Sequence, residues 1–473
     1  MSFLLRCLLL VTVFPGVSGC LMVGPDYQRP AVSMPLGNWR AALPHDGSRE
    51  QLTHWWDRFE DESLTILLKA TLDHHPGLDG AKAAIDVARA SLTGQEAQAR
   101  PKGDLGATMS RSGNHGNNPG EDEMSTAATV VDATWELDLF GRVKRATEGA
   151  NAKVAARQAE LQGLRVSLAA EVATLYTEWR GCERLRDSLA AERASREKTA
   201  AITQTAIAAG LVAASEGELA QAGLADVRAQ WTLQQASCDL VIKGLVVLSG
   251  LAEEEVRHLL NVGAVRWPKI APFAVTVVPV QLLSQRPDLV ASEEELVAAN
   301  AEIGVAEAGR YPRFSLLGSV GIGIADLGKS TLDHQPWSFG PALSLPIMDG
   351  GVREANVRSA QGRWQIALAN YRQAVRNAVR EVESALVNLA ALQARLVDGR
   401  MAAKRYAAYL SASEDHWRKG GISLLTLEDA RRKSIGAQRS VIQLERLEVQ
   451  QWINLYKALG GGWNPTAAPE GNG

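Results

Sequence analysis

The sequence predicts a mainly helical protein that also contains membrane β-strands, arranged as two tandem repeats. The first observation is a strand pattern that passes directly into a long helix pattern. From Thr129 to Leu139 apolar and polar residues alternate, which is the period of a strand with one apolar and one polar face. After Phe140-Gly141, a run rich in Ala, Glu and Arg continues to about residue 209 without a proline. A helix of that length would measure roughly 100 Å.

The second observation is that features of the first half recur about 211 residues later. The matched features are Pro76-Gly77-Leu78 with Pro287-Asp288-Leu289, Pro101 with Pro312, Asp138–Gly141 with Met348–Gly351, Gly210 with Gly421, and Leu248-Ser249-Gly250 with Leu459-Gly460-Gly461. Each repeat is therefore predicted to contain a helix, two strands, a long helix and a return helix.

The third observation is the distribution of proline. None occurs between Pro119 and Pro268 or between Pro346 and Pro465. Proline in a helix interior costs about 3 kcal/mol, so its absence over such lengths is what continuous helices require. Each gap is predicted to hold a helical hairpin, at about 141–209 with 215–248 and at about 351–419 with 424–459.

The N-terminus has the pattern of an export signal. Arg6 precedes a short apolar run, and small residues lead to Cys20. The placement of Cys20 after Ser-Gly resembles a bacterial lipobox, in which the chain is cut before a cysteine that carries lipid. Leucine rather than aspartate at the next position implies delivery to the outer membrane. The alternative is an ordinary signal peptide followed by an incidental cysteine.

The patterns divide the chain into six segments. They are a signal peptide at 1–19, a lipidated extended linker at 20–60, the first repeat at 61–250, an equatorial linker at 251–285, the second repeat at 286–463 and a disordered tail at 464–473.

Two cysteines remain once the signal peptide is removed and Cys20 is set aside. Their midpoint is Gly210, the expected tip between two antiparallel helices, so Cys182 and Cys238 should lie at about the same height. Because the exported compartment is oxidising, we predict a disulfide between them. The alternative is two separate buried thiols.

Four strands are predicted, at about 104–112, 129–139, 314–324 and 337–347. The clearest of them have the length of roughly 9–11 residues that a membrane strand needs. Four strands cannot close a barrel, so three chains are expected to form a shared barrel. That barrel would have twelve strands and would be continuous with a tube of helices. The alternative is a soluble sandwich packed on a coiled-coil rod. The strand–helix junctions are expected at Phe140, Gly141, Gly350 and Gly351, because glycine can adopt backbone angles that neither strand nor helix provides.

Several motifs together resemble the TolC-like outer-membrane efflux proteins, in particular the NodT-type lipoprotein branch. They are Cys20 with Val23–Pro30, Trp55-Trp56, Trp135–Arg142, Arg286–Leu289 and Ala298–Ala301. The resemblance implies a homotrimer whose β-barrel crosses the outer membrane and whose α-barrel reaches into the periplasm. It implies an exit duct for drugs or other small molecules, with a periplasmic adaptor and an inner-membrane pump of the resistance-nodulation-division class as partners. The lipid on Cys20 is the expected covalent group, and no other cofactor is expected.

The resemblance also implies a periplasmic gate near the tip of the second hairpin. The family motif there is similar to residues 425–432 of this chain. Leu425, Asp429 and Arg432 share one helical face, and threefold symmetry would turn Asp429 into a ring of carboxylates. Glu428 and Arg431 depart from the family motif. The alternative is an ordinary surface salt bridge.

Other functions fit the residues less well. The net charge of −3 gives no reason to expect a nucleic-acid partner, and the eight histidines form no ligand spacing beyond an adjacent pair whose side chains face apart on a helix. The sequence therefore predicts neither an enzyme nor a metal site. The remaining alternatives are the same duct serving metal-ion export or type I secretion, and a periplasmic coiled-coil structural lipoprotein. The sequence identifies neither the exported substrate nor the cognate pump.

Overall fold

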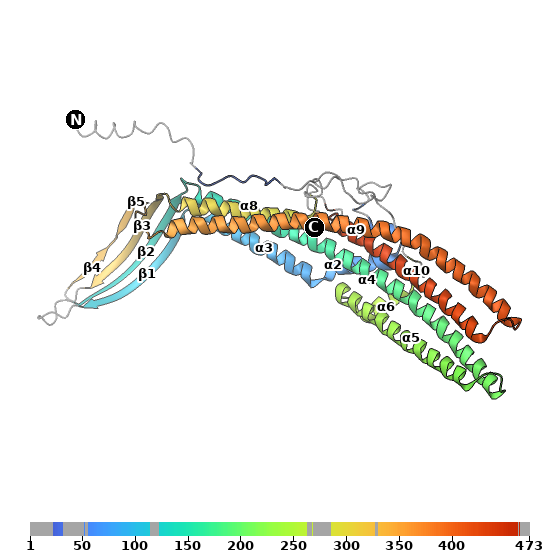
Figure 1. Cartoon of the computed structure of the whole chain (residues 1–473). Helices are drawn as coiled ribbons and strands as arrows, with labels where there is room; N and C mark the ends of the chain where they lie inside the picture. The colour runs from blue at the N-terminus through green and yellow to red at the C-terminus, as the bar shows by residue number, and fades with distance from the viewer. Residues whose placement is uncertain are drawn as a thin grey trace. The chain divides into compact units, whose positions relative to one another are not determined.

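The computed structural model describes residues 22–31, 55–113, 123–262, 285–326 and 330–461, with Leu52, Trp267 and Trp463. The predicted signal peptide, Cys20 and the predicted tail lie outside the described residues. The chain divides into two compact units. Unit 1 takes in residues up to 32, 83–158 and 291–372, and unit 2 takes in 33–82, 159–290 and 373–473. Helices α3, α4, α8 and α9, which are labelled in Figure 1, each contribute residues to both units.

The described elements follow the order helix, two strands, long helix and return helix twice. In the first half they are η2 (Trp56–Phe59), α2 (Glu62–His74), α3 (Pro76–Ala97), β1 (Lys102–Gly113), β2 (Glu123–Leu137), α4 (Arg142–Ala208), α5 (Ala214–Ser249) and α6 (Glu253–Val262). In the second half they are α8 (Pro287–Ala308), β3 (Arg313–Asp326), β4 (Thr331–His334), β5 (Trp337–Ser344), α9 (Val352–Arg418) and α10 (Leu424–Ala458). The four long helices match their predicted ranges to within one residue.

The strands form one antiparallel sheet in unit 1, in the order β1-β2-β3, with β4 and β5 both paired to β3. Gly323 faces His334 and Val320 faces Trp337, so β4 and β5 continue one register. They are one strand interrupted at Pro336, whose missing N–H cannot join the ladder. Its carbonyl still accepts from Gly321 N at 2.8 Å.

The predicted ranges of the second and fourth strands are wrong. The fourth strand begins at Thr331 and ends at Ser344, not at 337 and 347, and Pro346 lies just beyond its end. The second strand runs from Glu123 to Leu137 rather than from 129 to 139. It ends early because Asp138 turns out of the strand and caps the following helix, where its Oδ2 accepts from Lys144 N at 2.9 Å.

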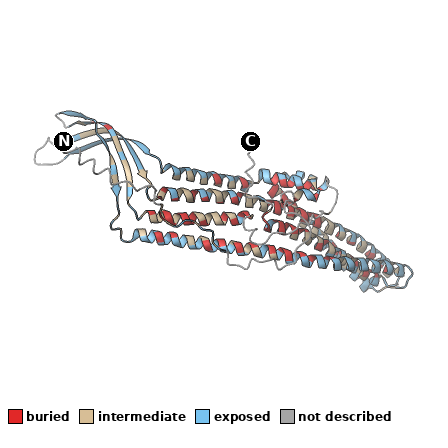
Figure 2. Cartoon of the chain, turned by 90° about the horizontal axis from the view of Figure 1, so that it is seen from above, coloured by how far each residue is buried: buried red, intermediate tan, exposed pale blue. Residues whose placement is uncertain are grey.

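The register places the alternating residues on two coherent faces. One cross-strand row is apolar and consists of Leu105, Val131, Val320 and Trp337. The next row is polar and consists of Asp104, Asp132, Ser319 and Ser338. Figure 2 shows that the strands are mostly exposed or intermediate and that the buried residues are concentrated in the helices. Trp337 is 79% exposed, so the apolar face of the sheet is open in a single chain.

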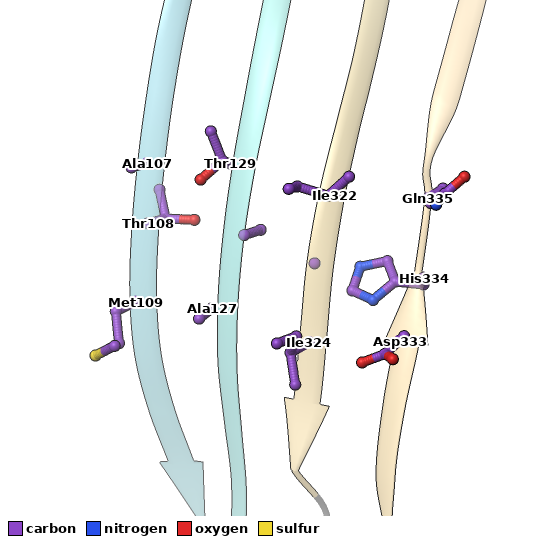
Figure 3. A pocket seen from close by; sticks show the side chains of 12 residues that line it. Ala107, Thr108, Met109, Ala127, Thr129, Ile322, Ile324, Asp333, His334 and Gln335 are labelled. Carbon is purple, nitrogen blue, oxygen red and sulfur yellow. The ribbon is translucent and has the colours of Figure 1, made fainter.

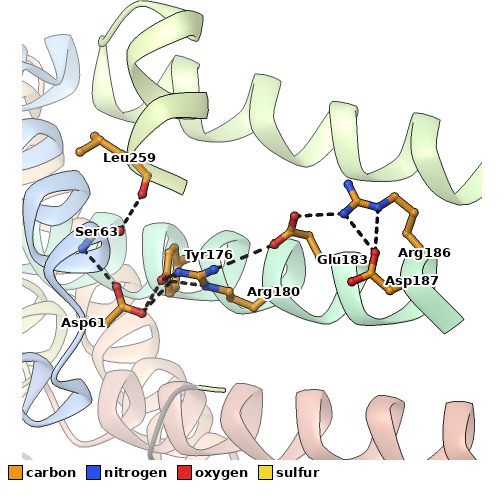
Figure 4. A network of polar contacts seen from close by, with 8 residues as sticks. All are labelled: Asp61, Ser63, Tyr176, Arg180, Glu183, Arg186, Asp187 and Leu259. Carbon is orange, nitrogen blue, oxygen red and sulfur yellow. Dashed lines mark hydrogen bonds and ion pairs between the residues drawn. The ribbon is translucent and has the colours of Figure 1, made fainter. Parts of the chain in front are cut away.

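Unit 2 contains a buried aromatic stack and a network of polar contacts. Trp55 stacks on Tyr456 with ring centroids 5.0 Å apart. The hydroxyl of Tyr176 donates to Asp61 and accepts from Arg180 Nε at 2.9 Å, and Asp61 also accepts from Ser63 N at 3.1 Å (Figure 4). Burial raises the pKa of Tyr176, which keeps its hydroxyl protonated. This network fixes the start of α2 against α4.

Within the described residues, no single helix is both long and apolar enough to cross a membrane. Helices α5 and α6 pass that test only when taken together, and they are bent by 114° at the break between them.

Residues 22–31 form an extended segment that packs on α4 and α8 within unit 1. The buried guanidinium of Arg145 donates to the carbonyls of Val23 at 3.3 Å and Gly24 at 3.1 Å, and to Asp26 at 2.7 Å. Asn300 Nδ2 donates to the Pro25 carbonyl at 2.8 Å. This segment is held by side chains that satisfy its backbone carbonyls, because an extended chain outside a sheet has no ladder of its own.

We expect Gly24→Ala to release this segment. Gly24 has φ +88°, and an added Cβ would lie 2.4 Å from the Cα of Gly304. The combined strain should cost about 1–3 kcal/mol and make residues 22–31 sensitive to protease. Limited proteolysis and thermal unfolding of the detergent-solubilised protein measure both effects. Gly94→Ala in α3 is the control, because an added Cβ there meets nothing within 4 Å. Equal protease resistance of the two variants would contradict the prediction.

Candidate functional site

The two strand–helix junctions have the same construction. Gly141 has φ +76° and precedes α4, while Gly350 and Gly351 have φ +63° and +89° and precede α9. These angles lie in the left-handed region that favours glycine. An aspartate caps each helix start: Asp138 caps α4, and Asp349 accepts from Gly351 N at 2.9 Å and Arg353 N at 3.1 Å.

The capping carboxylate at the second junction is electrostatically stabilised. The backbone N–H groups of Gly351 and Arg353, with the Arg353 side chain, lower the pKa of Asp349. At the first junction, the ring of Phe140 stacks on Tyr311 with centroids 4.7 Å apart. The carbonyl of Phe140 accepts from Val23 N at 3.3 Å, so the N-terminal segment begins beside this junction.

The two hairpin tips also share one geometry. At the first tip Gly210, with φ +69°, donates to Ile207 O at 2.9 Å, and Leu211 N donates to Ala206 O at 2.9 Å. This is a Schellman motif, which satisfies the last carbonyls of α4. At the second tip the glycine with φ +73° is Gly420, not the predicted counterpart Gly421. In the structure, Gly210 of the first repeat therefore corresponds to Gly420 of the second, one residue earlier than the repeat spacing in the sequence predicts.

The predicted gate residues lie together on the exposed side of α10. Leu425 is 52% exposed. The Asp429 carboxylate accepts from Arg432 at 3.0 Å and contacts the Lys433 ammonium at 2.7 Å. These two cations, Lys433 first, lower the pKa of Asp429, and the carboxylate in turn raises the pKa of Lys433. Lys433 was not among the predicted gate residues, although its spacing of four from Asp429 is the signal of a helical ion pair.

The two residues that depart from the family motif point into the chain instead. Glu428 accepts from Thr199 Oγ1 of α4 at 2.6 Å and from Arg431 at 2.8 Å. Arg431 also contacts Glu414 of α9 at 3.5 Å. This side of α10 therefore fastens the second hairpin to the first, while the side that carries Asp429 is left exposed.

The two predicted disulfide partners are joined in the structure. The Cα atoms of Cys182 on α4 and Cys238 on α5 are 5.6 Å apart, and their sulfurs are bonded. That separation is in the range usual for disulfides. Gln234 Nε2 donates to Cys182 Sγ at 2.9 Å. The bond ties the first hairpin together partway along its length.

A hollow of about 570 Å³ lies on the sheet, centred on the row of Thr108, Ala128, Gly323 and His334 (Figure 3). The His334 ring covers Gly323, where an added Cβ would lie 2.5 Å from Cε1. One sheet alone supplies the lining, so the hollow is an open face. Within the described residues, no three His, Cys, Asp or Glu side chains are arranged so that they could hold a metal ion.

Comparison with known proteins places this geometry in a family. A family model described as outer membrane efflux protein matches residues 67–248 and 278–461. Nodulation protein T of Rhizobium leguminosarum bv. trifolii is 32% identical over 469 residues, covering 95% of this chain and 96% of that protein. The solvent efflux pump outer membrane protein SrpC of Pseudomonas putida is 29% identical over 476 residues, covering 95% of this chain and 96% of that protein. The solved outer-membrane channel OprN has a TM-score of 0.83 at 30% identity, covering 94% of this chain and 100% of that one.

Reduction of the disulfide should destabilise the first hairpin. The bond closes a loop with a sequence separation of 56, and its loss should cost about 2–4 kcal/mol. Thermal unfolding with and without reductant measures this, and peptide mapping by mass spectrometry identifies the bonded pair. The variant Cys182→Ser with Cys238→Ser is the control, because reductant should not change its unfolding temperature further. Free thiols at both positions in protein isolated from the envelope would contradict the assignment.

Proposed function

The chain belongs to the outer membrane efflux protein family, and we propose that three copies form the outer-membrane exit duct of a tripartite efflux system. The duct passes drugs or other small molecules from a periplasmic adaptor and an inner-membrane pump to the exterior. The relatives named for solvent efflux and as outer-membrane channels support this role.

The observation that carries the proposal is a pair of unpartnered apolar stripes on the outermost helices of unit 2. On α5 the exposed residues Leu219, Leu233, Leu240 and Val247 recur at multiples of seven. On α9 the exposed residues Val387, Val397 and Met401 share one face. A spacing of seven residues keeps a seam on one side of a helix and is typical of helices that pack along a partner.

Ion pairs place these helices at the two ends of one row. The disulfide joins α5 to α4, Arg184 of α4 pairs with Glu445 of α10 at 2.8 Å, and Glu445 pairs with Arg400 of α9 at 3.1 Å. The order across the row is therefore α5, α4, α10, α9. These links also show that Cys238 on α5 lies at about the same distance along the row of helices as residue 400 on α9.

This order supports closure of a ring by identical chains. A row with one apolar stripe at each end buries both when α5 of one chain packs on α9 of the next, which is a head-to-tail contact that a rotation can close. The sheet has the same property, because β1 has one strand partner and β4 and β5 pair only with β3 among the described strands. Joining these edges in a trimer would give twelve strands without an open edge.

The two faces of the sheet support a membrane barrel with a water-filled interior. The apolar row that contains Val131 and Trp337 suits lipid, and the polar row that contains Asp132 and Ser338 suits water. The equal element order in the two halves supports two tandem repeats, with α3 beginning at Pro76 and α8 at Pro287.

A cysteine pair across the interface tests the trimer. Leu240→Cys with Val397→Cys places the two thiols at about the same level on α5 and α9. Mild oxidation should therefore produce covalent dimers and trimers on a denaturing gel. Leu240→Cys with Val387→Cys is the control, because Val387 lies ten residues, roughly 15 Å, further along the same stripe. Equal cross-linking of the two pairs, or none in either, would contradict the proposed contact.

The gate is tested by conductance. Asp429→Ala with Arg432→Ala shortens side chains that would narrow the passage at the tips, so single-channel conductance in planar bilayers should rise. Uptake of bulky antibiotics by cells that carry the variant should rise as well. Glu197→Ala with Arg228→Ala is the matched control, since this exposed ion pair of 3.0 Å lies on the first hairpin. Unchanged conductance and uptake in the Asp429 variant would remove the gate assignment.

A further inference from the structure

The tips of the two hairpins carry opposite net charges. Residues 404–433, around the second tip, contain seven Lys or Arg and four Asp or Glu. Residues 194–223, the corresponding window around the first tip, contain two Lys or Arg and three Asp or Glu. The repeats therefore share a backbone geometry at the tip but differ in charge, with the second tip positive and the first slightly negative.

Part of this positive charge lies on the exposed side that carries the gate residues. Asp429 pairs with two cations of its own chain, Arg432 at 3.0 Å and Lys433 at 2.7 Å. The side chains of Arg432 and Lys433 are 54% and 50% exposed, and that of Asp429 is 41% exposed. This cluster has a net charge of +1 on each chain, so its carboxylate is neutralised before any second chain approaches.

The other carboxylates of the second tip pair with cations outside this cluster. Glu428 and Glu414 both contact Arg431, and Glu428 is turned toward α4 with its side chain only 13% exposed. Asp415 pairs with Arg418 at 3.0 Å. These three carboxylates thus pair with Arg431 and Arg418 rather than with Arg432 or Lys433, and the exposed cluster of Asp429, Arg432 and Lys433 keeps its net charge of +1.

We propose that the periplasmic end of the duct is a net cationic constriction that favours anionic solutes, with Arg432 and Lys433 as the residues that set this preference. The inference rests on the proposed function, since three chains are needed to bring three such clusters together. A ring of carboxylates alone would select cations, whereas rings of Arg and Lys select anions, and a narrow passage strengthens the field of either. Here each carboxylate is outnumbered two to one by cations on the same helix face.

Reversal potentials in planar bilayers with a KCl gradient test the inference. The full-length wild-type protein should prefer chloride to potassium. Arg432→Gln with Lys433→Gln should lower the chloride-to-potassium permeability ratio by about threefold or more, because the net charge of the cluster changes sign. Asp429→Asn should raise that ratio, because it removes the only carboxylate of the cluster. Arg228→Gln on the first hairpin is the control and should leave the ratio unchanged.

The outcomes separate this inference from the proposed function. Discrete channels that prefer potassium, or a ratio that does not move in the Arg432 and Lys433 variant, would overturn the cationic constriction and leave the duct in place. A ratio that moves equally in the Arg228→Gln control would also overturn it. Absence of discrete conductance in the wild-type protein would overturn the duct and the constriction together.

Discussion

The structure depends on how a strand is converted into a helix without an intervening domain. At each junction an aspartate side chain caps the first turn and glycine takes a positive φ, so the unpaired N–H groups of the helix start find an acceptor. The same place organises its surroundings in unit 1. Residues 22–31 begin against Gly141, and Arg145, in the first turn of α4, binds the carbonyls of that segment. Sheet register, helix start and N-terminal segment are thus fixed by one short stretch of chain.

Two buried arginines fasten distant segments of the chain to one another. Arg145 is almost fully buried, and its guanidinium is satisfied by two backbone carbonyls, Asp26 and Glu148. Arg286 in unit 2 is similar: it donates to the carbonyl of Ala458 at 2.9 Å and pairs with Asp288 and Glu381, each at 2.8 Å. A buried charge without partners would be costly, whereas a fully bonded guanidinium specifies one arrangement of the segments around it. Arg145 and Arg286 therefore serve the architecture of the chain.

The long helices and the glycine junctions could be predicted from the sequence because their signals are local. Absence of proline and a change of period depend only on neighbouring residues. The ends of the strands could not be predicted in this way, since the carboxylate of Asp138 decides where β2 stops by binding an amide six residues later. The side toward which the Glu428 side chain points could not be predicted either, because it depends on the position of Thr199 on another helix. Leu425, Asp429 and Arg432 do share an exposed face, as predicted, but the prediction did not include Lys433, the second cation that pairs with Asp429.

The forces that would hold three such chains together differ along their length. In the shaft, the stripes on α5 and α9 would bury aliphatic side chains at about 25 cal/mol for each Å², an interaction that salt does not weaken. On α9 that aliphatic stripe ends at Met401, and the next exposed large hydrophobic side chains are Tyr406 and Tyr409. Beyond them the exposed face holds ion pairs, which are typically worth 0–1 kcal/mol and are screened by salt. A ring built in this way would be held more strongly along the α5 and α9 stripes than at the hairpin tips. The tips could then separate while the stripes stay buried.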